Sequence, residues 1–162
     1  MNDSMFGVGD SRTDLGGSGY MTEKHIHSHS IDCDAPPFVP DGWFGYRKHR
    51  RDGLFVWDPT KVTLWLSRDQ RDYGLAAGEA ICSELVGKPV LNANVLDYLL
   101  ANQHLIPEEL GCAYILFWGT EYHDLFGKPC IRYLYKSGAR WYWSSEWIDD
   151  ELNNHRQAIL RI

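Results

Sequence analysis

The stretch AYILFWGTEYHDLFGKPCIRYLYKSGARWYWSSEW, residues 113–147, decides the fold of this chain. Eleven of its 35 residues are aromatic, and aromatic side chains are enriched in strands. Two turn-like segments, residues 124–127 and residues 137–138, divide the stretch into three runs of strand length. The stretch therefore predicts a three-stranded antiparallel meander.

Alternation of side chains along each strand predicts two different faces for this meander. One face should be rich in rings, and the other should carry a mixture of apolar, charged and hydroxyl side chains. The ring-rich face would consist of Tyr114, Leu116, Trp118 and Tyr122, then Ile131, Tyr133 and Tyr135, then Trp141, Trp143 and Trp147. We expect most of these rings to pack under helices, with a few left exposed for contact.

The segment before the meander predicts a hairpin followed by two helices. Residues 54–57 and 62–66 read as strands, and the turn between them contains Pro59. Apolar residues in 76–86 and in 92–102 then recur at helical spacing. The predicted fold class is α+β, with an N-terminal β-hairpin, two helices and the three-stranded antiparallel meander. These strands should form one mixed-order antiparallel sheet with the helices on one face.

Composition divides the chain into a tail and a single domain. Residues 1–41 are rich in glycine, serine and aspartate and have few apolar anchors, which predicts a flexible N-terminal tail. Met21 is a candidate for the biological start beside Met1. Residues 42–162 contain all the elements named above and predict one α+β domain.

Charge and apolar pattern argue against several functional classes. The net charge is −6, and only residues 42–75 are basic, with seven bases against four acids. Because duplex binding needs many cations facing phosphates, nucleic acid is not an expected partner. No run approaches the ~20 apolar residues of a membrane span, and no secretory signal opens the sequence. We therefore expect a cytoplasmic protein, and the four cysteines, which form no CxxC pair, predict free thiols.

Three histidines at alternate positions form the pattern most similar to a metal site. His25, His27 and His29 would point to one side of an extended chain, and Cys33 is near enough to serve as a fourth ligand. The alternative is an incidental histidine-rich tail. We expect no cofactor, with zinc held by this tail as the exception to be tested.

Two further clusters carry charge without a recognised catalytic motif. The basic residues in 46–51 predict either a contact for a phosphate or acidic partner, or a solvated strand edge that discourages aggregation. Glu121 and Glu146 share a side of the two outer strands, and His123 lies close to the first of them. No nucleophile elbow, phosphate loop or HExxH motif is present. These observations do not favour an enzyme.

Several strings in the chain resemble a group of short uncharacterised bacterial proteins. The strings are GKPVLNANVLDYLLAN and HLIPEE in residues 87–109, FWGT at 117–120, RYLY at 132–135 and WYW at 141–143. The resemblance covers residues 50–150. That group has no established activity, so the resemblance implies no catalytic residue, cofactor or partner.

The residues favour a non-enzymatic protein-interaction or regulatory module that uses an aromatic-rich sheet surface. We predict Arg140, Trp141, Tyr142 and Trp143 as the contact residues, because the third run combines large rings with a basic side chain. The partner would be another protein or a second copy of this chain. The alternative is a ligand-binding module or enzyme with an aromatic-lined pocket for a sugar or nucleotide.

Overall fold

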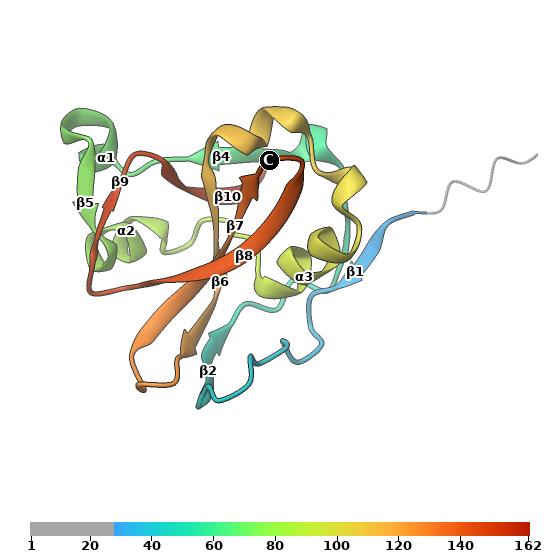
Figure 1. The fold of residues 1–162 in the computed structure, drawn as a ribbon, viewed down its shortest axis with the longest axis horizontal. Coiled ribbons are helices and arrows are strands. Elements are labelled where there is room, and N and C mark those ends of the chain that lie inside the picture. The colour runs from blue at the N-terminus through green and yellow to red at the C-terminus, as the bar shows by residue number, and fades with distance from the viewer. Residues whose placement is uncertain (1–27) are drawn as a thin grey trace, which may run out of the picture.

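The computed structural model describes residues 28–162, and its centre is a six-stranded mixed sheet (Figure 1). The strands in spatial order are β4 (Val62–Trp65), β10 (Arg156–Arg161), β6 (Tyr114–His123), β7 (Pro129–Ser137) and β8 (Arg140–Trp147), with β2 (Gly45–His49) paired to the far part of β6. β6, β7 and β8 form the antiparallel meander that the sequence predicts. The sequence predicted an antiparallel sheet. β10 instead runs parallel to β6, so the sheet is mixed.

The two strands of the expected N-terminal hairpin do not pair with each other. β3 (Leu54–Val56) pairs with β1 (Ser30–Asp32), and β4 pairs with β10. Between them the chain forms the short 3₁₀ helix η1 (Pro59–Lys61), whose first turn is capped by the side chain of Asp58. After this capped turn the chain does not return along β3, so the prediction of a hairpin is wrong.

Residues 28–41 belong to the packed structure, although the sequence places them in the tail. Ile31 and Cys33 are buried in the core, and the hydroxyl of Tyr122 donates to the backbone oxygen of Phe38. The packed part of the chain therefore includes residues well before the expected boundary at residue 42.

Polar side chains cap two of the helices that surround the sheet. In α1 (Arg68–Tyr73), Ser67 and Gln70 form a reciprocal capping box. α2 (Gly78–Leu85) follows β5 (Leu75–Ala77), which pairs with β9 (Glu151–Asn153). Asn92 caps α3 (Ala93–Ala101), and the 3₁₀ helices η2 (Gln103–Leu105) and η3 (Glu108–Cys112) lead into the meander.

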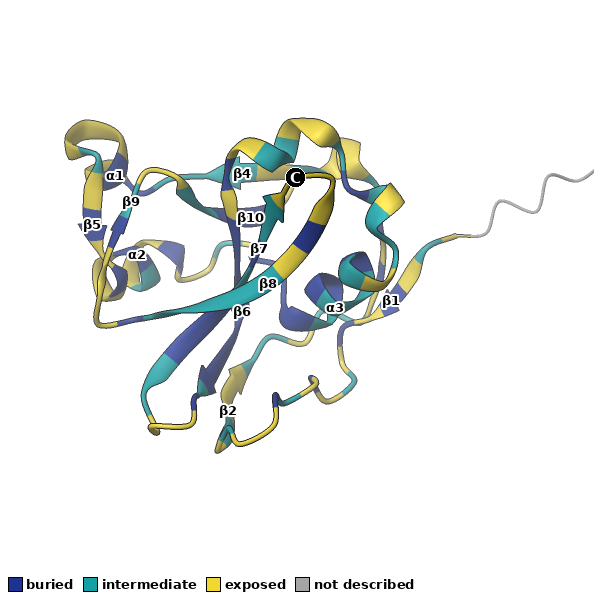
Figure 2. Ribbon diagram, in the orientation of Figure 1, coloured by how far each residue is buried: buried dark blue, intermediate teal, exposed yellow. Residues whose placement is uncertain are grey.

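α2 and α3 lie against opposite faces of the sheet, contrary to the expectation of helices on one face. One core cluster joins α3 to Phe117 and Leu134, and another joins α2 to Leu116 and Ile131. Residues 115–122 of β6 are all buried, because successive side chains alternate between the two faces (Figure 2). Residues 115–118 provide the apolar run that a strand covered on both sides needs, and the buried polar residues Thr120 and Glu121 have hydrogen-bond partners.

The rings of the meander are likewise divided between the two faces. Trp143 lies beside Leu134 in the β7–β8 ladder and packs on the α3 side, whereas the adjacent Tyr133 packs on the α2 side. Tyr122 is also on the α3 side, because the β6–β7 register shifts after Leu116 and changes the alternation. The expectation of one ring-rich face is therefore wrong.

An ion pair between a buried arginine and a half-buried aspartate fixes α3 to the sheet. Arg132 of β7 is 1% exposed, and its two terminal nitrogens donate to the carboxylate of Asp97 in α3 at 2.8 and 3.1 Å. Its guanidinium carbon lies 4.2 Å from the ring centre of Trp143, with Tyr122 and Phe38 at 5.9 and 5.5 Å. A guanidinium so enclosed depends on one carboxylate for its charge balance.

A second polar junction joins β2, β6 and the start of α3. Thr120 Oγ1 lies 2.9 Å from Nδ1 of His49 and accepts the backbone N–H of Ala93, and Nε2 of His49 lies 3.1 Å from the backbone oxygen of Cys33. These partners fit a neutral imidazole that accepts at Nδ1 and donates at Nε2. Burial lowers the pKa of His49 below its ordinary value of 6.5.

Removing the carboxylate of Asp97 should destabilise the protein strongly. We expect Asp97→Asn to lower the free energy of unfolding by about 3 kcal/mol, because the buried guanidinium loses its counter-charge. The double variant Asp97→Leu/Arg132→Met should recover more than half of this loss. Urea denaturation provides the measurement, with Asp72→Asn of the exposed Arg68–Asp72 pair as control. An Asp97→Asn protein as stable as the control would contradict the role of the ion pair.

His49 should make the folded state sensitive to acid. Since its folded pKa lies below the unfolded value, the unfolded chain binds the proton more tightly. The stability that His49 contributes is complete above pH 6.5 and decreases as the pH falls through that value. Thermal denaturation from pH 8 to 5 should show a shallower decline for His49→Gln than for the original chain. Equal slopes would show that His49 is not the group responsible.

Candidate functional site

Four tyrosines from three neighbouring strands lie together on one side of the sheet. This tyrosine face consists of Tyr114 of β6, Tyr133 and Tyr135 of β7, and Tyr142 of β8. Ring centres are 5.4 Å apart for Tyr114–Tyr133, 5.9 Å for Tyr133–Tyr135 and 5.8 Å for Tyr135–Tyr142. Such spacings allow edge and tilted contacts that hold each ring in place.

The tyrosine face lies at the margin of the core cluster below α2. Tyr133 packs against the core cluster below α2, and burial raises the pKa of its hydroxyl. The other three rings extend beyond that cluster, and Tyr114 and Tyr142 are 36% and 43% exposed. Because the rings stand on paired strands, their orientation is fixed by the same backbone that forms the core.

Charged groups surround these rings. The guanidinium carbon of Arg156 lies 5.0 Å from the ring centre of Tyr114, a cation–π arrangement. Arg156 also donates to the carboxylate of Glu146, so the charge over the ring is held in one position. Lys136 pairs with Glu108 at the end of β7, and His155 is exposed beside β6.

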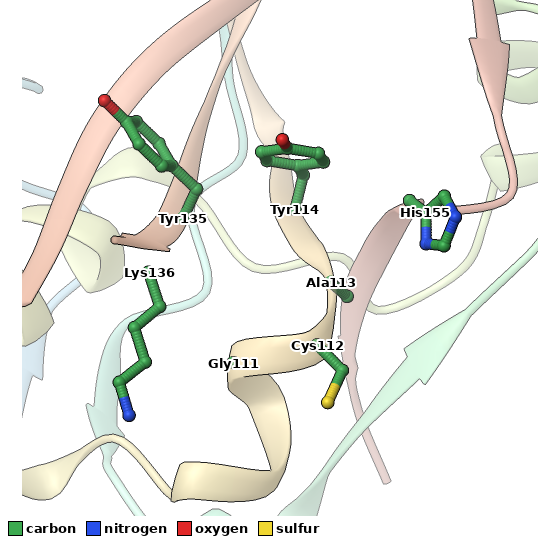
Figure 3. Close-up of a pocket in the computed structure, with 7 residues that line it drawn as sticks. All are labelled: Gly111, Cys112, Ala113, Tyr114, Tyr135, Lys136 and His155. Carbon is green, nitrogen blue, oxygen red and sulfur yellow. The ribbon is translucent and has the colours of Figure 1, made fainter. Parts of the chain in front are cut away.

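A hollow of about 310 Å³ opens next to the tyrosine face, lined by Gly111, Cys112, Ala113, Tyr114, Tyr135, Lys136 and His155 (Figure 3). The rings of Tyr114 and Tyr135 stand on one side of it, and the side chain of Lys136 extends away from them past Gly111. The surface can therefore stack a planar or apolar group against rings and hydrogen-bond to phenol hydroxyls.

The predicted contact residues are separated by the alternation of β8. Trp141 is buried at 4% exposure, and the carboxamide of Gln103 occupies both its backbone N–H and its backbone oxygen. Trp143 is half-buried over Arg132, whereas Arg140 and Tyr142 are exposed. All four line a second hollow of about 380 Å³, which shares Tyr135 with the first.

Sequence reasoning did not choose Tyr114, Tyr133 and Tyr135 as contact residues. They were expected on a ring-rich side, but the predicted contact residues were Arg140, Trp141, Tyr142 and Trp143 of the third run. Two features could have pointed to these tyrosines as contact residues. Tyrosine alternates with other residues at 133 and 135, and it has a smaller apolar area than tryptophan and a polar end.

The expected metal site falls mostly outside the described residues. His25 and His27 lie before residue 28, and Nδ1 of His29 is 2.9 Å from the hydroxyl of Tyr98. Cys33 is buried, and burial raises the pKa of its thiol to about 11, which opposes the thiolate that zinc requires. Within residues 28–162, no group of three or more His, Cys, Asp or Glu side chains could hold a metal ion.

The acid residues considered for catalysis occupy separate ion pairs. Glu121 is 3% exposed and accepts from Arg47 at 2.6 Å and from Lys48 at 3.3 Å. Glu146 binds Arg156. His123 ends β6, where it pairs with Gly45 and Pro129 in the sheet ladders, and in the described chain no hydrogen bond links it to either glutamate.

None of the helices in residues 28–162 is both long and apolar enough to cross a membrane. Comparisons of the whole chain with protein-family models, with curated proteins and with solved structures found no match.

Proposed function

We propose that this protein is a non-enzymatic interaction or regulatory module that binds another protein through its tyrosine face. The observation that carries the proposal is the arrangement of Tyr114, Tyr133, Tyr135 and Tyr142 on three paired strands, with three of the rings outside the core cluster. Tyrosine is enriched at protein interfaces, because its ring buries a large apolar area while its hydroxyl remains able to hydrogen-bond.

Rigidity supports a contact role for this surface. A ring that is already fixed by its neighbours loses little conformational entropy when a partner covers it. The cation over Tyr114 is fixed in the same way by Glu146. The exposed positions at the margin, Arg140 and His155, leave a polar rim around the rings, which is the usual anatomy of an interface.

The face is a better contact surface than the edge of β8. Gln103 already satisfies the backbone of Trp141, so part of that edge is closed to a further strand. A partner that covers the tyrosine face needs no free backbone groups. A second copy of this chain fits the same description as another protein, and the test below separates the two cases.

The hollow beside Tyr114 and Tyr135 favours a second candidate, a binding module for a sugar or nucleotide. Its volume of about 310 Å³ is at the lower end of small-molecule sites. Sugars and bases stack on tyrosine rings, and His155 and Lys136 could reach polar groups at the margin.

The double variant Tyr135→Ser/Tyr142→Ser tests the proposed function. Partner capture from an extract of the native cell, quantified by mass spectrometry, should recover a protein with the original chain and at least about tenfold less with the variant. Tyr73→Ser is the matched control, because Tyr73 is 80% exposed on α1, outside the tyrosine face. Circular dichroism checks that each variant is folded.

The outcomes divide the possibilities. Equal recovery by the double variant would refute the tyrosine face as the contact surface. Sedimentation that shows a dimer of the original chain and a monomer of the double variant identifies the partner as a second copy. Saturable NMR shifts of the four tyrosines with a sugar or nucleotide, and no captured protein, would replace the proposal with the second candidate.

A further inference from the structure

A separate hollow of about 460 Å³ lies between β2, β6 and the segment after α2. It is lined by Lys48, His49, Arg50, Leu85, Lys88, Val90, Trp118 and Gly119. It is larger than the hollow beside the tyrosine face and shares no residue with it. The hollow brings Lys48 and Arg50, which are two residues apart, together with Lys88 from a distant part of the sequence.

The three cations differ in whether they already have a carboxylate partner. Lys88 makes no ion pair with any described residue, and its ammonium nitrogen lies 5.6 Å from the ring centre of Trp65. The side chain of Lys48 is 63% exposed and 3.3 Å from Glu121, which has a closer partner in Arg47 at 2.6 Å. Both ammonium groups are therefore available to an added anion.

Arg50 is held in a fixed orientation at the same hollow. Its Nε donates to Asp52 at 2.6 Å, and its Nη1 donates to the backbone oxygen of Lys88 at 2.6 Å. The second bond ties the residue that follows β2 to the segment that carries Lys88. A guanidinium that is fixed on one side presents its remaining N–H groups in a constant direction, which favours a planar or tetrahedral oxyanion.

The charge around the hollow is positive although the chain is acidic. Lys48, Arg50 and Lys88 contribute three positive charges to the hollow, and Glu121 and Asp52 are the carboxylates that pair with Lys48 and Arg50. The remaining excess is concentrated in a concave surface, where field lines focus and attract anions.

The floor of the hollow is apolar. Leu85, Val90 and Trp118 are buried residues of the core cluster below α2, and each also lines the hollow. Gly119 allows β6 to lie close to the backbone of Asn92, because a Cβ at this position would lie 2.8 Å from that backbone. Cations at the rim and an apolar floor match a molecule that carries both an anionic group and a hydrophobic body.

We propose that this basic hollow binds a small phosphate-bearing molecule. Lys48, Arg50 and Lys88 contact the phosphate oxygens, and the floor around Trp118 accommodates the organic part. A dianionic phosphate suits three convergent cations better than a single carboxylate does. The alternative for the basic residues of β2 is protection of a sheet edge, which needs no ligand.

Titration of the full chain with pyrophosphate and with AMP tests the proposal. NMR should show saturable shifts of the Trp118 indole N–H and of residues 48–50, and calorimetry should give the dissociation constants. Sodium chloride at matched ionic strength should not reproduce the shifts. We expect AMP to bind more tightly than pyrophosphate; equal affinity would overturn the part assigned to the apolar floor.

Variants of the two lysines make the test specific. Lys88→Gln and Lys48→Gln should each weaken binding by about tenfold, the loss expected for one charge-assisted hydrogen bond. Lys61→Gln is the control, because Lys61 is also an exposed lysine and lies outside the hollow. Unchanged affinity in both lysine variants, or no saturable shift in the original chain, would overturn the proposal. Both lysines reach solvent, so loss of folding is not expected to obscure the result.

Discussion

The guanidinium of Arg132 imposes the constraint on which the rest of the structure depends. It lies in β7, with β6 on one side and β8 on the other, and it is almost completely removed from water. Desolvating a permanent cation is so costly that a carboxylate must accompany it. Asp97 is that carboxylate, and it fixes both the position and the rotation of α3 on the sheet.

The same cation organises the rings on its face. Trp143, Tyr122 and Phe38 surround it from β8, β6 and the segment before β2. In the described residues the Nε of Arg132 has no hydrogen-bond partner, so these ring faces and one carboxylate supply most of its environment. The packing of residues 28–41 against the sheet follows partly from this arrangement, because Phe38 contributes one of the rings.

The orientation of Arg132 in β7 determines which neighbouring side chains lie on the opposite side of the sheet. Tyr133 follows Arg132 in β7, and Tyr135 has the same orientation as Tyr133. A shift of one residue in the β7 register would move these tyrosines to the α3 side and would move the guanidinium away from Asp97. The ion pair under α3 therefore specifies the aromatic surface on the other side of the same strand.

Local signals in the sequence predicted the elements, and long-range pairing decided what the sequence could not. The meander, the two helical segments and the general α+β class depend on residues within a few positions of each other. The partners of β3 and β4 are strands far away in the chain, and nothing in the turn at Pro59 identified them. The faces were misjudged for two reasons that the sequence does not mark: β8 pairs with β7 so that Trp143 lies opposite Leu134, and a register shift in β6 breaks the strict alternation before Tyr122.

The site residues follow the same division. Aromatic richness was visible, but the choice between tryptophan and tyrosine depended on which side of β7 the helix α3 covers. The basic residues of β2 were also visible, with two interpretations left open. Lys88 and Trp118 joined them only through the pairing of β2 with β6 and through the bond from Arg50 to the backbone of Lys88.

β6 carries parts of both proposed surfaces, and its packing keeps them apart. Tyr114 belongs to the tyrosine face, Trp118 lines the basic hollow, and Leu116 between them is buried in the core below α2. Gly119 is fixed by hydrogen bonds from its N–H to Leu91 and to its oxygen from Arg50. A strand held at so many points cannot slide or rotate without disturbing both cores. The two proposed binding surfaces therefore lie on one rigid strand, and we expect that occupation of one would not rearrange the other.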